Sequence, residues 1–287
     1  MKVKVITSYK PGCWEQYGKK GIESMAEQFP KEVDIVVYAE EPKPECKYDR
    51  IQWIDLNTAE PELFKFKNKH KNDPVANKGG VRRPAELQTK GGMDKNKGSF
   101  LWAAVRFANK VFCVVNAVRN SKDYDYVVWI DGDTFSFRPI PMDFFEKLLP
   151  QDTMLTYLGR ENPKLNDGGK YPECGFVGYN MRHTEIQNFV NDWEKLYVTD
   201  EVFKLLEWHD SYVFWHLSKL YRKEKSIQVN DIGYWKGVKG HHVFVNSELG
   251  QYMDHMKGKR KKTGSSARSD LRSVPTVDYW KKAPPSL

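Results

Sequence analysis

The chain has 287 residues, of which 40% are hydrophobic and 14% aromatic, so it can bury a substantial core and an intrinsically disordered chain is excluded. Its length suits one large domain or two small ones. The sequence has no run of 18 apolar residues, so no membrane span is expected, and the polar start "MKVKVITSYKPG" predicts a strand rather than a signal peptide. We therefore expect a cytoplasmic protein with reduced thiols at its four scattered cysteines, Cys13, Cys46, Cys113 and Cys174.

Positive charge is concentrated in two places, within a formal net charge of +8. In the basic segment 65–97, ten lysines and arginines are opposed by three acidic residues, and "KGKRKK" at 257–262 forms a second cluster. Such clusters attract polyanions or phosphorylated small molecules, and they also occur as solvated loops and tails. A nucleic-acid-binding module is one reading of this charge, although no helix-turn-helix, zinc or stacking-sheet signature accompanies it.

The first forty residues predict a strand–helix–strand unit. Residues 3–8 alternate as a strand, 12–29 place apolar side chains at helical spacing, and 33–40 form a second strand. Two strands joined by a helix in this way pair in parallel. The next stretch, 42–97, is rich in Pro, Gly, Asn and Lys and is expected to be irregular apart from a short strand at 50–56.

The middle of the chain gives the clearest pattern. Residues 99–120 carry one apolar stripe, in which the small Ala108 admits a close neighbour, and they predict a helix. Residues 126–130, "YVVWI", are continuously apolar and predict a central strand covered on both faces. The order of elements predicts one α/β domain with a mixed sheet. The remaining predicted elements are strands at 134–140, 153–159, 174–181 and 241–246, and helices at 142–149, 183–198, 210–221 and up to Met256.

Two aspartates separated by one glycine follow the central strand. Asp131 and Asp133 are expected at the carboxyl end of a parallel strand, where open α/β sheets bind ligands, and Gly132 allows a ligand close to the backbone. Their oxygen donors favour a divalent cation such as Mn²⁺ or Mg²⁺, and a surface turn capped by aspartates is the simpler alternative. Phosphatases of the haloacid dehalogenase type use a similar motif, but they typically carry Thr or Val where this chain has Phe135. Their motif also usually lies near the N-terminus, whereas more than a hundred residues precede it here.

A second motif, "HMKGKRK", places His255, Gly258 and Lys261 in an H-x-x-G-x-x-K spacing. Together with the D-x-D motif it makes the chain resemble GT-A glycosyltransferases, especially retaining enzymes related to glycogenin and bacterial and phage-type glycosyltransferases. The resemblance implies a GT-A fold, which is a Rossmann-like, nucleotide-sugar-binding α/β fold with a mixed central sheet flanked by helices. It also implies that His255 completes the metal site, while Gly258 and Lys261 reach the donor diphosphate.

The resemblance extends to other parts of the chain. Arg106 and Lys110 stand on the helix where the relatives carry a donor-contacting basic residue, and "YPECGFVGYN" is similar to their Gly-containing strand on the acceptor side. The chain departs from glycogenin-type enzymes at 262–263, where Lys-Thr replaces Pro-Trp, and at 209–211, where His-Asp-Ser replaces an Asp-Gln pair. The implied organisation is one catalytic domain, 1–287, with a nucleotide-sugar-binding half at 1–134, an acceptor-side half at 135–262 and a tail at 263–287.

Two carboxylates and three residues near the first strands are further candidates. Glu173 and Asp210 could stabilise the oxocarbenium-like state of glycosyl transfer, or could be a salt-bridged acid and a helix cap. Thr7 and Tyr9 follow the first strand, where this fold receives the nucleotide base, with an ordinary strand exit as the alternative. Tyr38 ends the second strand, and core packing is its alternative.

Weaker candidates are two histidines and two tryptophans. His241 and His242 compete with His255 as metal ligand, but they lack the following Gly and Lys. Trp208 and Trp235 could stack on a sugar, although most of the nine tryptophans are expected in the core.

These observations predict a metal-dependent glycosyltransferase that moves a sugar from a nucleotide-sugar donor, expected to be UDP-linked, to an acceptor hydroxyl. The H-x-x-G-x-x-K resemblance implies retention at the anomeric carbon. We expect a glycan or small hydroxyl acceptor rather than a modified base in DNA. A DNA acceptor stays possible because of the basic segment 65–97. A nucleic-acid-binding module without enzymatic activity is the alternative from another class.

Overall fold

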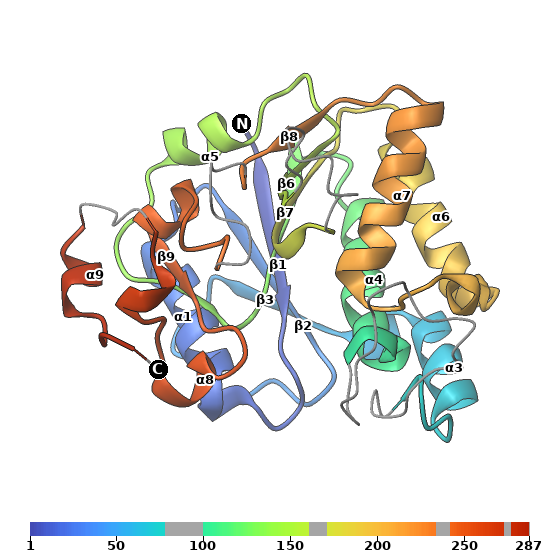
Figure 1. Cartoon of the computed structure of the whole chain (residues 1–287), viewed down its shortest axis with the longest axis horizontal. Helices are drawn as coiled ribbons and strands as arrows, with labels where there is room; N and C mark the ends of the chain where they lie inside the picture. Colours follow the sequence, from blue (N-terminus) through green and yellow to red (C-terminus); the bar gives the residue numbers. More distant parts are fainter. Residues whose placement is uncertain (78–99, 161–170, 234–241, 273–276, 287) are drawn as a thin grey trace.

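The computed structural model describes residues 1–77, 100–160, 171–233, 242–272 and 277–286. In this part of the chain seven strands form one sheet, in the order β3-β2-β1-β4-β7-β6-β8, that runs through the molecule (Figure 1). Its strands are β1 (Val3–Ser8), β2 (Asp34–Ala39), β3 (Ile51–Asp55), β4 (Tyr126–Ile130), β6 (Leu155–Leu158), β7 (Glu173–Asn180) and β8 (Val229–Asp231).

The strand directions bring several chain ends to one edge of the sheet. β1 is parallel to β2 and β4, and β2 is parallel to β3, so the predicted parallel start is confirmed. β7 runs antiparallel to both β4 and β6. The carboxyl ends of β1, β4 and β6 therefore share an edge with the amino end of β7. The sheet is mixed, as predicted.

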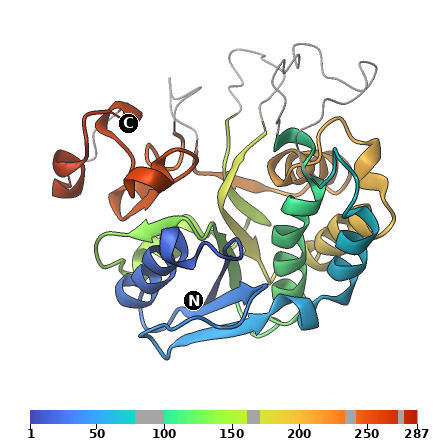
Figure 2. The same cartoon turned by 90° about the horizontal axis from the view of Figure 1, so that it is seen from below.

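Helices cover both faces of the sheet (Figure 2). Helices α3, α4, α6 and α7 lie on one face, and α1 and α5 pack with the other. The predicted α/β class, with a mixed central sheet flanked by helices, is confirmed. The helices are α1 (Lys19–Gln28), α2 (Leu56–Ala59), α3 (Pro61–His70), α4 (Ala104–Arg119), α5 (Met142–Leu148), α6 (Ile186–Val198), α7 (Asp210–Glu224), α8 (Arg260–Thr263) and α9 (Asp278–Lys282).

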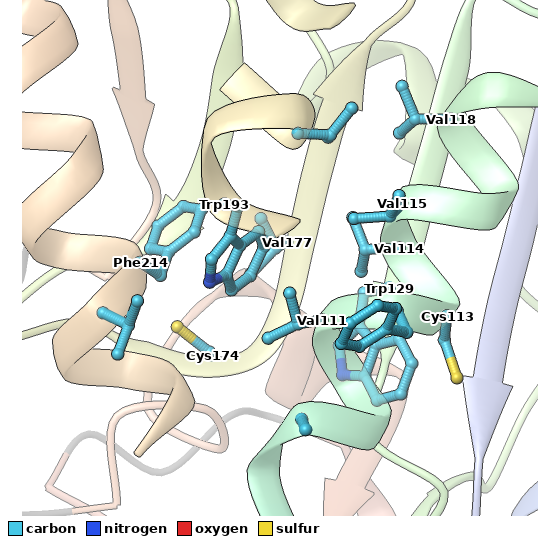
Figure 3. Packing of buried hydrophobic residues seen from close by; sticks show 14 of the residues in the cluster. Val111, Cys113, Val114, Val115, Val118, Trp129, Cys174, Val177, Trp193 and Phe214 are labelled. Atoms are coloured by element: carbon cyan, nitrogen blue, oxygen red, sulfur yellow. The ribbon is translucent and has the colours of Figure 1, made fainter. Parts of the chain in front are cut away.

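Strand β4 is buried on both faces, as its continuous apolar sequence predicts. Trp129 points into the core under α4, where it lies near Val111 (Figure 3). Val128 and Ile130 belong to the opposite core, beneath α1. The strand is therefore fixed from both sides, and this holds the residues that follow it in a defined place.

A second, two-stranded sheet lies beside the first. It pairs β5 (Thr134–Ser136) with β9 (Met253–His255) in antiparallel fashion. The predicted helix ending near Met256 is therefore wrong: a short 3₁₀ turn at Glu248–Gln251 is followed by a strand. The predicted strand at 241–246 is also wrong, since residues 243–246 form turns and residue 241 lies outside the described residues.

The C-terminal strap, residues 266–272 and 277–286, packs on this second sheet. The Tyr279 ring stacks on Phe137 with the ring centroids 4.0 Å apart, and the fully buried Trp280 donates a hydrogen bond from Nε1 to the Gly250 carbonyl at 2.7 Å. Tyr279 also donates to the buried carboxylate of Asp254 on β9 at 2.6 Å. The strap therefore supports β9 and the residues next to it.

Two sequence expectations near the N-terminus need correction. The segment 42–97 contains the expected short strand, β3, but its described part also holds α2 and α3, so it is not irregular throughout. The predicted helix at 12–29 begins with a π-helical turn at Trp14–Gly18 before α1 starts. Within the described residues, every helix is too short or too polar to cross a bilayer.

Candidate active site

The D-x-D motif is held tightly against β1 and α1. A Cβ atom on Gly132 would lie 2.3 Å from the Ser8 carbonyl oxygen, so only glycine fits there. Gly21 on α1 has the same role, because its Cβ would lie 2.4 Å from the Gly132 oxygen. The turn is closed by a 2.9 Å hydrogen bond from the Thr134 amide to the Asp131 carbonyl. These contacts fix the two aspartates at the carboxyl end of β4.

Strand β9 brings His255 to the same place. Its register pairs Thr134 with His255, and the Met256 amide donates to the Asp133 carbonyl at 2.8 Å. The fully buried imidazole places Nε2 3.2 Å from Asp133 Oδ1 and 3.6 Å from Asp131 Oδ2. One ligand atom from each of these three residues lies within 4.8 Å of the others. The three residues could hold a divalent metal ion.

Each aspartate uses one oxygen for a neighbouring cation and turns the other toward His255. Asp131 Oδ1 accepts from Lys110 Nζ at 3.0 Å and from Trp129 Nε1 at 2.6 Å. Asp133 Oδ2 lies 2.8 Å from Lys261 Nζ. The remaining oxygens, Oδ2 of Asp131 and Oδ1 of Asp133, face the imidazole nitrogen. Two carboxylate oxygens and one imidazole nitrogen form a donor set that suits a divalent metal ion.

Asp133 is ionised in this setting. Burial opposes its charge, but the His255 imidazole and then the Lys261 ammonium lower the pKa of the carboxyl well below its usual range. The fixed negative charge explains why two cationic or metal-ligating groups gather on one buried side chain.

The H-x-x-G-x-x-K spacing has a direct structural reason. Gly258 has φ of +66°, in the left-handed region that favours glycine, and it reverses the chain between β9 and α8. The reversal returns Lys261 to the site, where its ammonium also lies 4.6 Å from the centroid of the Tyr17 ring. Both ends of the motif therefore contact the same carboxylate, that of Asp133.

The basic cluster at 257–262 is built into the protein rather than being a solvated tail. Lys257 Nζ lies 2.8 Å from Glu173 Oε1, and Arg260 Nε donates to Asp270 Oδ2 at 2.9 Å. With the Lys261 contact to Asp133, three of its five cations bind carboxylates. Sequence reasoning singled out Lys261, but it did not assign a partner to Lys257 or Arg260.

Lys110 is a buried ammonium that links two acids. Its Nζ lies 3.0 Å from Asp131 Oδ1 and 2.8 Å from Asp210 Oδ2, and it also donates to the Cys174 carbonyl. Burial opposes the charges of Lys110 and Asp210. Against this, Lys110 lowers the pKa of Asp210, while Asp131 and then Asp210 raise the pKa of Lys110. Lys110 and Asp210 are therefore both charged. Arg106, one turn earlier on α4, is exposed, with its guanidinium carbon 5.4 Å from the centroid of the Phe107 ring.

Glu173 begins β7 and lies on the other side of His255. Its Oε1 is 3.6 Å from His255 Nδ1, and its Oε2 accepts from Arg160 Nη2 at 2.9 Å. Burial opposes ionisation, but Lys257 followed by His255 lowers the pKa of the Glu173 carboxyl well below its usual range. Glu173 is an ionised, nearly fully buried carboxylate.

The other sequence candidates near the first strands are not part of the metal-ligand group. Thr7 is buried next to Gly132, and Tyr9 packs against Trp14 with ring centroids 5.5 Å apart. The Tyr38 hydroxyl donates to Asn116 Oδ1 at 2.9 Å inside the core, which matches the core-packing alternative.

The alternative histidine and one tryptophan have structural roles. His242 Nε2 is hydrogen-bonded to the His255 carbonyl at 2.8 Å, so that nitrogen supports the ligand strand. Trp208 is buried, 4.8 Å from the Phe203 ring between centroids. His241 and Trp235 lie outside the described residues.

Several residues of the site were missed from sequence. A glycine inside a predicted strand is a signal of close backbone approach, and Gly175 has this role, because its Cβ would lie 2.8 Å from His255 Cε1. Arg160 and Lys257 gave no comparable signal, since the partner of each is set by the fold. In the described part of the chain, four carboxylates of the site (Asp131, Asp133, Glu173, Asp210) contact four lysine and arginine side chains (Lys110, Arg160, Lys257, Lys261).

Comparisons with known proteins give a fold likeness only. No known family model matches the sequence, and no curated protein matches it significantly. Among solved structures, the chain is similar to mouse xyloside xylosyltransferase 1 in its apo form, with 12% sequence identity and a TM-score of 0.42. That alignment covers 81% of this chain and 85% of the mouse chain.

Proposed function

We propose that this protein is a metal-dependent glycosyltransferase of the GT-A type that uses a nucleotide-sugar donor, with UDP as the expected nucleotide. One observation carries the proposal: two motifs that are 122 residues apart in sequence meet on a single buried carboxylate, Asp133. A D-x-D turn that merely caps a surface loop has no need of a buried imidazole and an ammonium on the same side chain.

The residues at the site fit a diphosphate leaving group. Asp131, Asp133 and His255 would hold the cation, which when bound would supply positive charge to the diphosphate. A divalent ion held by these residues would add two positive charges, which match the two negative charges of the diphosphate in a nucleotide-sugar donor. Lys261, whose ammonium lies 2.8 Å from Asp133 Oδ2, is at the same position, where it would offset charge on the departing phosphate.

Asp210 is the carboxylate that we assign to the reacting sugar. It starts α7 at the sheet edge that carries the D-x-D motif, and Lys110 connects it to Asp131. Because its pKa is lowered, it is negative at neutral pH and would stabilise an oxocarbenium-like centre through space. We propose retention at the anomeric carbon from the H-x-x-G-x-x-K motif.

The described part of the basic segment gives little support to a DNA acceptor. Three of its lysines are already in ion pairs, Lys65 with Glu62, Lys67 with Glu40 and Lys69 with Asp200. Paired ammonium groups bind phosphates less readily than free ones, since the existing pair must be broken. This leaves less charge for a nucleic-acid backbone than the sequence suggests.

Aromatic side chains around His209, the residue before Asp210, favour a glycan acceptor. Phe100 is 52% exposed, and its ring centroid lies 5.3 Å from that of His209, which precedes Asp210 in the chain. Tyr171, two residues before Glu173, lies 4.6 Å from the same imidazole. Apolar ring surface beside polar groups is the composition that sugar rings contact. We therefore propose a glycan or another small hydroxyl compound as acceptor.

Ligand-dependent thermal stability tests the donor part of this proposal. We expect Mn²⁺ with UDP to raise the melting temperature of the wild type, and the increase to vanish in Asp133→Ala. Asp152→Ala, at an exposed aspartate, is the matched control and should keep the increase. No metal-dependent stabilisation by UDP or GDP would refute the donor proposal. A mass-spectrometric search for products, using several nucleotide sugars with glycans and with hydroxymethylated DNA, then identifies the acceptor class.

A further inference from the structure

His255 has one ring nitrogen whose role is not explained by the metal-ligand group. Nε2 faces the aspartates, while Nδ1 is buried and has no hydrogen-bond partner among the described residues. Within the same part of the structure, the acid in ion-pair range of Nδ1 is Glu173, whose Oε1 lies 3.6 Å away. The imidazole thus lies between two sets of carboxylates, one at each nitrogen.

The backbone is shaped to allow this approach. Gly175 lies on β7 beside the ring, and a Cβ there would be 3.0 Å from His255 Nδ1 and 3.4 Å from Glu173 Oε1. The missing side chain lets the imidazole and the carboxylate meet against the strand. An alanine at this position would push the two groups apart.

Glu173 is itself held in place from two sides. Lys257 binds Oε1 at 2.8 Å and Arg160 binds Oε2 at 2.9 Å. Both oxygens are therefore engaged by cations, and an attack on a sugar would require one of them to be released. A fixed, ionised acceptor is better suited to orienting a neighbour than to covalent chemistry.

The chemistry of a ligating histidine completes the argument. A neutral imidazole that presents the Nε2 lone pair to a cation carries its proton on Nδ1, and a buried N–H needs an acceptor. We propose that Glu173 is a positioning residue: it accepts the Nδ1 proton of His255, and so fixes the tautomer and the ring orientation in which Nε2 completes the metal site. The proposal rests on the proposed metal-dependent function and changes the role that the sequence suggested for Glu173.

The affinity for a metal ion in the absence of nucleotide tests the positioning role of Glu173. The probe is Mn²⁺ alone, with the free ion measured by electron paramagnetic resonance. We expect Glu173→Met, which has a similar size but no oxygen acceptor, to bind Mn²⁺ about 10–100-fold more weakly than the wild type, which is the usual effect of losing such a partner. Circular dichroism checks that the variant is folded.

A double-mutant cycle separates positioning from simple attraction between Glu173 and the ion. In a His255→Ala background, Glu173→Met should cause no further loss of Mn²⁺ affinity, because the residue that Glu173 positions is gone. An equal loss in both backgrounds would show that Glu173 acts through its charge, and would overturn the proposal.

The wild type gives an independent measurement that needs no substitution at Glu173. In Mg²⁺-loaded protein, the ¹⁵N spectrum should show His255 protonated on Nδ1, with the signal assigned by its loss in His255→Ala. A proton on Nε2 would overturn the inference. If the wild type binds neither cation, the proposed function fails together with the inference, whereas normal binding in Glu173→Met refutes the inference alone.

Discussion

Replacing Lys110 by methionine removes the cation that joins Asp131 to Asp210. The side chains of Lys110 and Asp210 are 9% and 11% exposed, whereas that of Asp131 is 29% exposed and can be hydrated. The cost therefore falls mainly on Asp210, which keeps a buried charge without its partner. Removing one member of a buried pair typically costs about 3–5 kcal/mol, and we expect Lys110→Met to lower the free energy of unfolding by that amount.

Urea denaturation followed by circular dichroism, in EDTA at pH 7, measures this loss. The double variant Lys110→Met/Asp210→Asn should be about 1–3 kcal/mol more stable than Lys110→Met, since it no longer buries the unpaired charge. Additive effects of the two substitutions, or a loss below about 1 kcal/mol for Lys110→Met, would refute the assignment of a buried, charged pair.

The pH dependence of the same experiment has a defined sign. In the wild type Lys110 lowers the pKa of Asp210, so the stability from this pair is present above the unfolded pKa of about 4 and is lost as the pH falls through the lower folded value. In Lys110→Met, burial without a partner raises the Asp210 pKa. The difference between wild type and variant should therefore be largest at pH 7 and should shrink toward pH 4.

Three further substitutions test single contacts. Gly175→Ala should displace the His255 ring and weaken Mn²⁺ binding about tenfold, and unchanged binding would contradict the tight contact. Gly258→Ala should lower the free energy of unfolding by about 1–2 kcal/mol because of the positive φ, and should also weaken Mn²⁺–UDP binding. The control Gly12→Ala, also at positive φ and in open space, should lower the free energy of unfolding without changing that binding. Tyr279→Phe should cost about 1.5–3 kcal/mol in urea denaturation, since the buried carboxylate on β9 loses a donor, and a neutral effect would show that this contact is unimportant.

The sequence predicted the parts of the site that carry a local pattern. Asp131 and Asp133 follow a continuously apolar strand, and a strand of this kind is expected to be buried on both faces of a sheet. His255, Gly258 and Lys261 are linked by a fixed spacing, which the turn at Gly258 converts into a shared contact with Asp133. A short motif whose residues are brought to one side chain by a single turn can be recognised from the sequence alone.

The contacts that depend on distant pairing could not be read in this way. β9 has three residues and no alternation to detect, and it exists because β5 offers it a partner. Glu173 binds Lys257, which is 84 residues away, and no local feature of either residue selects the other. The sequence of α3 was dominated by its lysines, and its short apolar side, Leu63 and Phe66, was too small to mark a helix inside a polar stretch.

The separate small sheet has a consequence for dynamics. A pair of three-residue strands is marginally stable by itself, so β9 depends on the strap that covers it. Local unfolding of β9 and the strap would withdraw His255 while the large sheet, with Asp131 and Asp133, stays folded. A metal ion bound by Asp131, Asp133 and His255 would connect the large sheet to β9 and so oppose this local unfolding. Hydrogen exchange at the β9 amides should then slow when the site is filled, while exchange in β4 remains slow in either state.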